Sequence, residues 1–472
     1  MAKSKTLGLD VDGTQKMMRT GDYMADMGGQ LALGIMGNLV GQLTYFYTDK
    51  VGLAVGGVGV AMMIAKVLDA FTDIIFGHFI DRMKGGKEKY YKWLIYMGVP
   101  AALITVLLFT VPGSMGSLPS LIYVCITNIL FTAVIYTMIS TPYAAIMVIR
   151  TNSQNERNKI GVFRAVGNYG AGMIISVATI PLTNALGGTQ NAWVKYGVIL
   201  GLVILLLFLV SWNNLRKAKF ADEVGTENQP EAAEEESGSF ADSLGMLVRN
   251  KYWIIVLLFN LITQITNSMV GSAGTYYCKW IFGNDNLVAI IGMGGMVATV
   301  IGFVLSNPII NKIGVRNTVY FGLLGASITA GIRCFAPSNF YLYIVTSLIG
   351  SFVQIPLMCL YGVLLAMAVD YNEWKYGKRL LAISSGAIGF GSKVGGGIGT
   401  LLLTGILTIG GYEATLAVAT DSMRMSIYAL GNYVPLIINL IMFAIFTQFD
   451  LEKKLPQIHA DLEARRKENA HN

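Results

Sequence analysis

Long runs of apolar residues alternate along the chain with short polar segments. Each run approaches or exceeds the about 20 residues that a helix needs to cross the hydrocarbon core of a bilayer. Six runs precede a long polar segment, and six follow it. The pattern therefore predicts an all-α membrane protein with twelve transmembrane helices in two six-helix halves. We place the spans near residues 28–47, 55–80, 92–112, 119–148, 162–186, 193–212, 252–280, 286–310, 316–335, 340–369, 381–410 and 424–448.

The polar segments divide the chain into four regions. Residues 1–212 are the N-terminal half, 213–250 a flexible cytoplasmic linker, 251–449 the C-terminal half and 450–472 a charged cytoplasmic tail. The linker contains the acidic run EAAEEESG, a composition that cannot bury enough apolar surface to fold. Each half also carries a short basic turn after its second span. This weak internal similarity is typical of a two-half transporter that binds its substrate near the membrane midplane.

Composition and charge agree with a membrane location. Only 13% of the residues are charged and 54% are hydrophobic, and the mean hydropathy is +0.55. A soluble domain carries about 25% charged residues, so a purely soluble protein is excluded. The lysines and arginines gather in alternate loops, which by the positive-inside rule places both termini and the linker in the cytoplasm. The net charge of +7 is thus a topology signal for the plasma (inner) membrane, and no nucleic-acid partner is expected.

The second span contains charged residues that a membrane helix rarely carries. Asp69 and Asp73 are four residues apart, so their carboxylates share one face of the helix. Two adjacent carboxylates in a low dielectric need a counter-charge, which predicts a cation or proton site. The alternative is a structural ion pair with Lys66, although one lysine cannot neutralise two carboxylates.

Further polar residues lie inside other spans. Lys393 lies deep in the eleventh span among glycines that allow a neighbouring helix to pack closely. It is expected to face the carboxylate pair or to donate to a substrate, and the alternative is that it snorkels to the interface. Arg164, which opens the fifth span, either contacts the substrate or lies at the interface. In the first span, Asp26 is interpreted as a helix cap, whereas Gln30 lies deep enough to serve a site.

The fourth span ends in the sequence YTMISTPY, which is rich in hydroxyl groups. Pro142 leaves a backbone carbonyl without its helical donor, and a cavity or a hydroxyl group can satisfy that carbonyl. Thr137 and Ser140 offer oxygen ligands for a cation or hydrogen bonds for a sugar. The alternative is that both hydroxyls bond back to their own helix.

The sequence contains no phosphate-binding loop, dinucleotide-binding loop, metal triad or nucleophile constellation. We therefore expect neither an enzyme nor ATP-driven transport, and no cofactor besides a coupling ion.

The chain resembles the glycoside–pentoside–hexuronide:cation symporters, a branch of the major facilitator superfamily that includes the melibiose permeases. Six blocks in the same order carry the resemblance, which covers nearly all twelve spans. They are FYTDKVGL at 46–53, KVLDAFTDIIFGHFIDR at 66–82, YTMISTPY at 136–143, ERNKIGVFR at 156–164, VDYNEWKYGKR at 369–379 and SKVGGGIG at 392–399.

The resemblance implies a role for each matching residue. Two aspartates and a hydroxyl would bind the coupling cation, which is Na⁺ if transport is sodium-coupled, and polar residues of both halves would bind the sugar. The implied cation ligands are Asp69, Asp73 and Thr137, and the implied substrate ligands are Gln30, Tyr136, Ser140, Arg164 and Lys393.

The substrate positions depart from the melibiose permeases. Ser140 replaces an aspartate, Ala144 replaces a tryptophan, and Gln30 aligns best with an aspartate of the first span. A galactoside substrate is therefore doubtful. Since Arg164 and Lys393 are kept while carboxylates are lost, the cavity becomes more positive, which suggests the hypothesis of an acidic sugar such as a hexuronide.

The leading prediction is symport of a sugar or glycoside with Na⁺ or H⁺ by a protein that acts as a monomer in the lipid bilayer. A lysolipid or drug carrier on the same fold is the first alternative. A sensor that binds ligand without translocating it is the second, although the linker and the tail are too short to hold a signalling domain.

Overall fold

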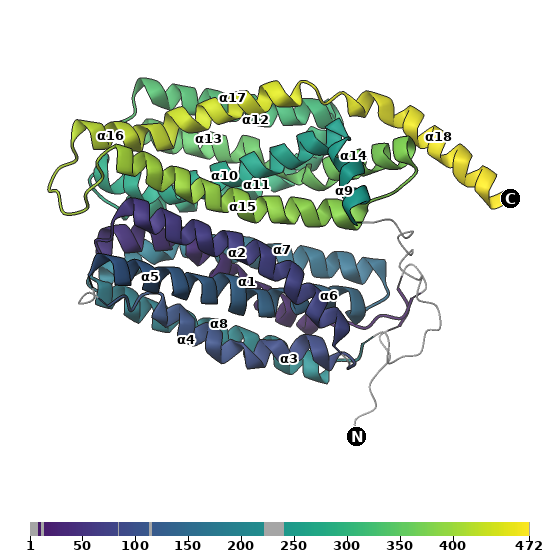
Figure 1. Ribbon diagram of the computed structural model, residues 1–472, viewed down its shortest axis with the longest axis horizontal. Coiled ribbons are helices and arrows are strands. Elements are labelled where there is room, and N and C mark those ends of the chain that lie inside the picture. The colour runs from purple at the N-terminus through teal and green to yellow at the C-terminus, as the bar shows by residue number, and fades with distance from the viewer. Residues whose placement is uncertain (1–7, 11–13, 84, 113–115, 221–239, 472) are drawn as a thin grey trace. The chain divides into compact units, whose positions relative to one another are not determined.

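The computed structural model of the protein describes residues 8–10, 14–83, 85–112, 116–220 and 240–471. Almost all of these residues are helical, so the predicted all-α fold is confirmed. The chain forms two compact units, each a bundle of long helices (Figure 1). Unit 1 consists of Met1–Pro230 and Glu413–Thr415, and unit 2 consists of Glu231–Tyr412 and Leu416–Asn472.

Unit 1 contains the helices of the first six predicted spans. They are α1 (Thr20–Tyr45), the π-helix η1 (Phe46–Lys50), α2 (Val55–Arg82), α3 (Glu88–Tyr96), α4 (Gly98–Leu107), α5 (Ser117–Asn128), the π-helix η3 (Ile129–Tyr136), α6 (Thr137–Arg150), α7 (Gln154–Ala185) and α8 (Gln190–Lys217).

Unit 2 contains the helices of the last six spans and two shorter amphipathic or polar helices at one end. They are α9 (Phe240–Val248), α10 (Lys251–Trp280), α11 (Leu287–Ile313), α12 (Val315–Phe335), α13 (Phe340–Cys359), α14 (Tyr361–Tyr376), α15 (Leu381–Ile409), α16 (Asp421–Tyr428), the π-helix η5 (Ala429–Tyr433), α17 (Val434–Phe446) and α18 (Leu451–His471).

Ten segments of the described chain are long and apolar enough to cross a membrane. Helices α1 and α2 are comparably long, with 26 and 28 residues, and both carry polar side chains. Helix α2 carries Lys66, Asp69 and Asp73, and α1 carries Gln30 and Asn38. Together with these two helices, the ten segments account for the twelve predicted spans.

Several predicted spans are not single α-helices. The span predicted at 92–112 begins at Glu88 and is divided after Tyr96, and the span predicted at 340–369 is divided at Leu360. A proline lies near each division, Pro100 near the first and Pro356 near the second. Because proline has no backbone N–H, it removes a hydrogen bond from the helix there. In the fourth and twelfth spans, the π-helices η3 and η5 widen the helix without ending it.

The region predicted as a flexible linker, 213–250, is structured at both ends. Helix α8 continues to Lys217, and α9 packs Leu247, which is fully buried, against Tyr252 and Trp253. The predicted linker was too long, because α9 is short and lies beside an acidic run in the sequence. The acidic run itself falls within 221–239, outside the described residues.

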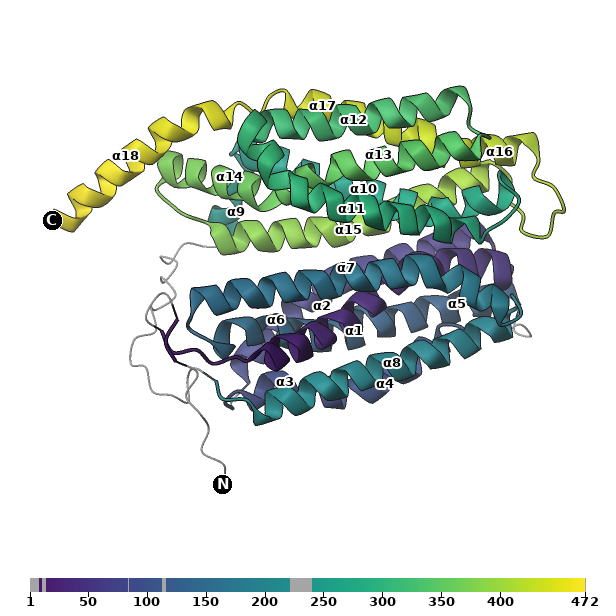
Figure 2. The ribbon, with the colours of Figure 1, turned by 180° about the vertical axis from the view of Figure 1, so that it is seen from behind.

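Close approaches of glycine backbones hold the helix pairs together. In unit 1, α1 packs along α7 (Figure 2), and a Cβ atom at Gly167 of α7 would lie 2.8 Å from the carbonyl oxygen of Met27. In unit 2, α15 packs along α10, and a Cβ atom at Gly395 would lie 2.6 Å from the carbonyl oxygen of Leu261. Gly399 approaches the carbonyl of Ile265 in the same way. The close packing predicted around Lys393 is thus confirmed.

The first long helix of each unit ends in the same turn. After α1, Leu53 N donates to the Tyr47 carbonyl at 3.0 Å, and after α10, Asn284 N donates to the Cys278 carbonyl at 3.0 Å. Each turn contains a glycine with a positive φ, Gly52 at 77° and Gly283 at 76°. The matching residues lie at a constant offset, so the two halves share an internal repeat here.

The predicted C-terminal tail is a helix that packs onto unit 2. In α18, Ile458 and Leu462 are buried in the same core as Phe449, and Trp374 of α14 donates to Asp461 at 2.8 Å. At its start, Glu452 accepts hydrogen bonds from the backbone N–H groups of Val315 and Arg316, so it caps α12.

Candidate functional site

The two carboxylates of α2 meet one hydroxyl group of α6. The hydroxyl of Thr137 lies 2.8 Å from Asp73 Oδ1 and 3.3 Å from Asp69 Oδ1. Asp69 is 3% exposed, so this cluster lies inside unit 1. Because a hydroxyl has a single hydrogen, it can donate to only one carboxylate at a time. The cluster thus joins five side-chain oxygen atoms, the ligand type that hard cations prefer.

A π-helix ends immediately before the hydroxyl. Thr137 follows η3, and its hydroxyl lies 3.5 Å from the carbonyl of Thr132, five residues back. The shorter contact to Asp73 shows that the hydroxyl is directed at the carboxylates rather than mainly at its own helix. Among the described residues, no group of three or more His, Cys, Asp or Glu side chains forms a metal cluster. At this site the hydroxyl oxygen of Thr137 lies beside the oxygens of the two carboxylates.

Two of the predicted substrate residues flank this hydroxyl. Tyr136 is the last residue of η3, and Ser140 lies one turn after Thr137 in α6, and both are half-buried. A Cβ atom at Gly37 of α1 would lie 3.9 Å from the Tyr136 hydroxyl, so this tyrosine approaches α1. Thr137 thus links the carboxylates of α2 to the segment that carries Tyr136 and Ser140. A change in its contact with the carboxylates acts on both residues, since they lie within two turns of it.

The predicted substrate residue Arg164 is paired with an acid. Its Nε lies 2.7 Å from Asp26 Oδ2, and its Nη2 lies 2.9 Å from Asp26 Oδ1. Nη2 also donates to the carbonyl of Tyr143 at 3.1 Å, and the guanidinium lies 4.3 Å above the Tyr143 ring. The Tyr143 hydroxyl in turn contacts Asp26. This bidentate pair, with 12% and 7% of the two side chains exposed, joins α7 to α1.

The interpretation of Asp26 as a helix cap is wrong. Helix α1 begins at Thr20, and the acid that accepts a hydrogen bond at its start is Asp22, to which the backbone N–H of the N-cap residue Arg19 donates at 2.7 Å. Asp26 lies beyond the first turn, and its charge balances Arg164. Sequence spacing gave no signal for this pair, because its members are 138 residues apart.

The remaining predicted residues lie on two different helices. Gln30 is half-buried on α1, one turn after Asp26. Lys393 is half-buried on α15 in unit 2, between the glycine contacts to α10. That Lys393 faces Asp69 or Asp73 stays a prediction, as does the alternative of an ion pair between Lys66 and these carboxylates.

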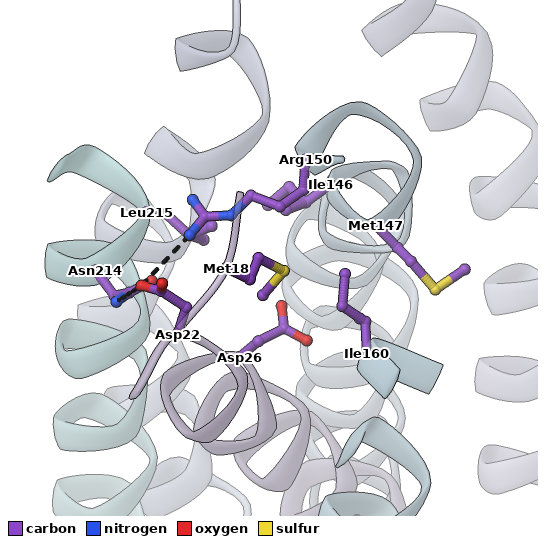
Figure 3. Close-up of a pocket in the computed structure, with 9 residues that line it drawn as sticks. All are labelled: Met18, Asp22, Asp26, Ile146, Met147, Arg150, Ile160, Asn214 and Leu215. Atoms are coloured by element: carbon purple, nitrogen blue, oxygen red, sulfur yellow. Dashed lines mark hydrogen bonds and ion pairs between the residues drawn. The ribbon is translucent and has the colours of Figure 1, made fainter. Parts of the chain in front are cut away.

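A small pocket beside the Asp26–Arg164 pair contains residues that the sequence did not suggest. Met18, Asp22, Asp26 and Arg150 all line it (Figure 3). Asp22 accepts from Asn214 Nδ2 at 2.7 Å and lies 3.5 Å from Arg150 Nη2. Arg150 was interpreted only as one of the loop lysines and arginines that set topology, but it is 2% exposed.

The fold and these polar clusters define a class, the helical membrane transporters of the major facilitator type. The nucleoside transporter NupG has a similar structure, with a TM-score of 0.61 at 12% identity, covering 91% of this chain and 99% of that one, a likeness that concerns the fold alone. The chain belongs to the family described as MFS/sugar transport protein, which matches residues 27–453. The resemblance to the glycoside–pentoside–hexuronide symporters is thereby confirmed.

Two relatives illustrate the family. The inner membrane symporter YicJ of Escherichia coli is 28% identical over 415 residues, which cover 87% of each chain. The isoprimeverose transporter of Lactiplantibacillus pentosus is 28% identical over 446 residues, covering 91% of this chain and 88% of that one.

Proposed function

We propose that the protein is a secondary transporter that moves a sugar or glycoside together with Na⁺ or H⁺ by alternating access. The observation that carries this proposal is the contact of the Thr137 hydroxyl with Asp69 and Asp73. Two carboxylates at this position in a membrane helix are retained only if a cation or a proton balances them. The relatives named as an inner membrane symporter and as an isoprimeverose transporter support the same conclusion.

The geometry suggests how the cation is coupled to the sugar. A cation that binds between the carboxylates takes a lone pair of the Thr137 hydroxyl and so reorients the start of α6. Tyr136 and Ser140 lie on the same helix, so the occupied cation site orders part of the sugar site. We assign Gln30, Arg164 and Lys393 to the remainder of the sugar site. Rocking of the two halves then exposes both sites to the other side.

The charge of the sugar site bears on the class of substrate. Because Asp26 balances Arg164, this pair contributes no net positive charge. The hypothesis of an acidic sugar then rests on Lys393 alone. The convergence of Asp26, Arg164 and Tyr143 also favours a hydroxylated substrate over the lysolipid or drug alternative, since such a polar cluster binds hydroxyl groups better than acyl chains.

We further propose that the protein lies in the inner membrane as a monomer with both termini in the cytoplasm. The distribution of lysine and arginine among the loops supports this orientation. Fusion of a reporter that is active only outside the cytoplasm should give no signal at residue 472. The same reporter inserted in the loop between α4 and α5 should give a strong signal.

Uptake into proteoliposomes tests the proposed function. A panel of labelled neutral glycosides and uronides is offered with and without a Na⁺ gradient, and then with a pH gradient. We expect concentrative uptake of at least one compound that collapses when the gradient is removed. The variants Asp69→Cys and Asp73→Cys should lose concentrative uptake, whereas Asp421→Asn, a change at the exposed start of α16, should keep it. Unchanged accumulation by both cysteine variants would refute the proposal.

A further inference from the structure

Arg150 is a buried cation with an incomplete set of partners. Its Nη2 reaches Asp22 Oδ1 only at 3.5 Å, and its guanidinium lies 5.2 Å from the ring of Phe220. Within the described ranges, its Nε and Nη1 atoms have no hydrogen-bond partner. A buried guanidinium with two unpaired nitrogens is costly, because each missing hydrogen bond leaves the desolvation of a buried polar group uncompensated. In the observed position, Arg150 therefore has one long ion pair, to Asp22, and no carboxylate that pairs with its Nε or Nη1.

A second carboxylate lines the same pocket as Arg150, namely that of Asp26, which is paired with Arg164. Asp26 and Arg150 line the same pocket, on α1 and α6. Figure 3 shows the Met18 side chain in the middle of this pocket, between the guanidinium of Arg150 and the carboxylate of Asp26. The Asp26 carboxylate thus lies near two buried arginines, Arg164 and Arg150. The thioether side chain of Met18 separates it from Arg150.

The backbone of Met18 is fixed by a different acid. Glu156 accepts hydrogen bonds from Met17 N at 3.1 Å and from Met18 N at 3.0 Å, and it also accepts from the Thr151 hydroxyl at 2.5 Å. The Met18 side chain is 7% exposed. The segment before α1 therefore holds Met18 in the pocket, while the unbranched side chain itself can adopt other rotamers.

We propose that Met18 is a gate between two ion pairs and that Arg150 is the alternative partner of Asp26. When Met18 leaves the space, Arg150 takes over the Asp26 carboxylate, and Arg164 is released toward the substrate. The inference rests on the proposed function only for its last step, the contact of Arg164 with the substrate. Met18 and Arg150 are positioning residues in this scheme, since neither contacts the substrate.

The exchange changes the charge that the site offers to a substrate. While Arg164 is held by Asp26, the pair is neutral and its fork of donors is occupied at Nε and Nη2. After the exchange, the same guanidinium is an uncompensated cation whose Nε and Nη2 no longer donate to Asp26, which suits a planar carboxylate. The gate therefore determines whether this part of the site favours a neutral sugar or an acidic one.

The release of Arg164 can be measured without a substrate. Purified protein is treated with phenylglyoxal, which modifies accessible guanidinium groups, and the rate at Arg164 is followed by mass spectrometry of its peptide. We expect Met18→Ala to raise this rate at least about fivefold, a factor at the lower end of typical couplings between sites. Met18→Leu, which conserves volume, and Met24→Ala, a change at a 50% exposed methionine of the following helix α1, should leave the rate unchanged.

Substitution of Arg150 distinguishes an exchange of ion-pair partners from a simple increase in the solvent exposure of Arg164. In the double variant Met18→Ala/Arg150→Gln, Arg164 should again react at the wild-type rate, because no cation is left to take Asp26. If the double variant reacts as fast as Met18→Ala alone, Met18 only blocks solvent and the exchange is wrong. Arg150→Gln alone should react more slowly than wild type, and an equal rate would also overturn the exchange, even if Met18→Ala does not fold.

Transport links the exchange to substrate choice. Uptake of the labelled neutral glycoside that wild type transports best is competed with its uronide analogue. Met18→Ala should need at least about fivefold less uronide for half-inhibition than wild type, and the double variant should not. If Met18→Ala needs the same uronide concentration for half-inhibition as wild type, although Arg164 is modified faster, contact of Arg164 with the substrate is rejected. Absence of uptake by wild type would instead reject the proposed function and leave the modification result standing.

Discussion

The guanidinium of Arg164 and the carboxylate of Asp26 form a bidentate ion pair that joins α7 to α1 inside unit 1. The ring of Tyr143 lies 4.3 Å beneath the guanidinium, and its hydroxyl contacts Asp26. The buried guanidinium thus donates to oxygen acceptors, and the buried carboxylate accepts from N–H and O–H donors. This is the condition under which a buried ion pair becomes tolerable in a low dielectric.

Removal of the acid from this pair should destabilise unit 1. Asp26→Asn leaves the Arg164 charge buried without a counter-charge, which costs about 3–5 kcal/mol when a buried pair is broken. We expect a clearly lower midpoint of thermal unfolding in detergent, measured by tryptophan fluorescence. Asp22→Asn is the matched control, because its side chain is 20% exposed and its partner Arg150 lies 3.5 Å away. Equal midpoints for the two variants would contradict this account.

The hydroxyl between the carboxylates should control coupling. Thr137→Val removes a hydrogen bond to a charged group, worth about 1.5–3 kcal/mol, and it also removes a cation ligand. We expect the cation concentration for half-maximal uptake to rise more than about tenfold, following the same energy. Thr137→Ser keeps the hydroxyl and should restore most of the response. A Ser variant as defective as the Val variant would show that shape at this position, rather than the oxygen, matters.

Much of the carboxylate cluster could be predicted from the sequence. Asp69 and Asp73 are four residues apart on one helix, so helical geometry alone places them together, and charged residues in an apolar run are conspicuous. Thr137 was added by the resemblance to a known family. The structure brings all three into contact.

The partner of Arg164 could not be predicted in this way. Asp26 lies near the polar start of α1, where an acid has an ordinary explanation as a cap, and its partner is 138 residues away. The burial of Arg150 was missed for a similar reason, since a basic residue at the end of a span is expected to face the cytoplasm. Tertiary packing of α1, α6 and α7 decides both cases, and no local pattern reports it.

The C-terminal helix should contribute to the stability of unit 2. Glu452 accepts from Val315 N at 2.8 Å and from Arg316 N at 2.9 Å, so Glu452→Gln weakens the cap of α12. Loss of such a cap costs about 0.5–2 kcal/mol, and we expect a correspondingly lower midpoint of thermal unfolding. Glu463→Gln, an exposed position of the same helix, is the control and should leave the midpoint unchanged.

Adjacent glycines of α15 should respond differently to the same substitution. A Cβ atom at Gly395 would lie 2.6 Å from the carbonyl oxygen of Leu261, so Gly395→Ala forces α15 away from α10. At Gly396 a Cβ atom would meet nothing within 4 Å, and alanine is favoured over glycine in a helix by about 1 kcal/mol.

We therefore expect Gly395→Ala to lower the thermal midpoint and the uptake rate, because Lys393 lies two residues away on the displaced helix. Gly396→Ala should preserve the midpoint or raise it. Both variants are compared by unfolding in detergent and by uptake at equal protein density. If both lose stability to the same degree, helix packing through Gly395 is not the cause. In that case the glycines of this span serve a motion that alanine suppresses at either position.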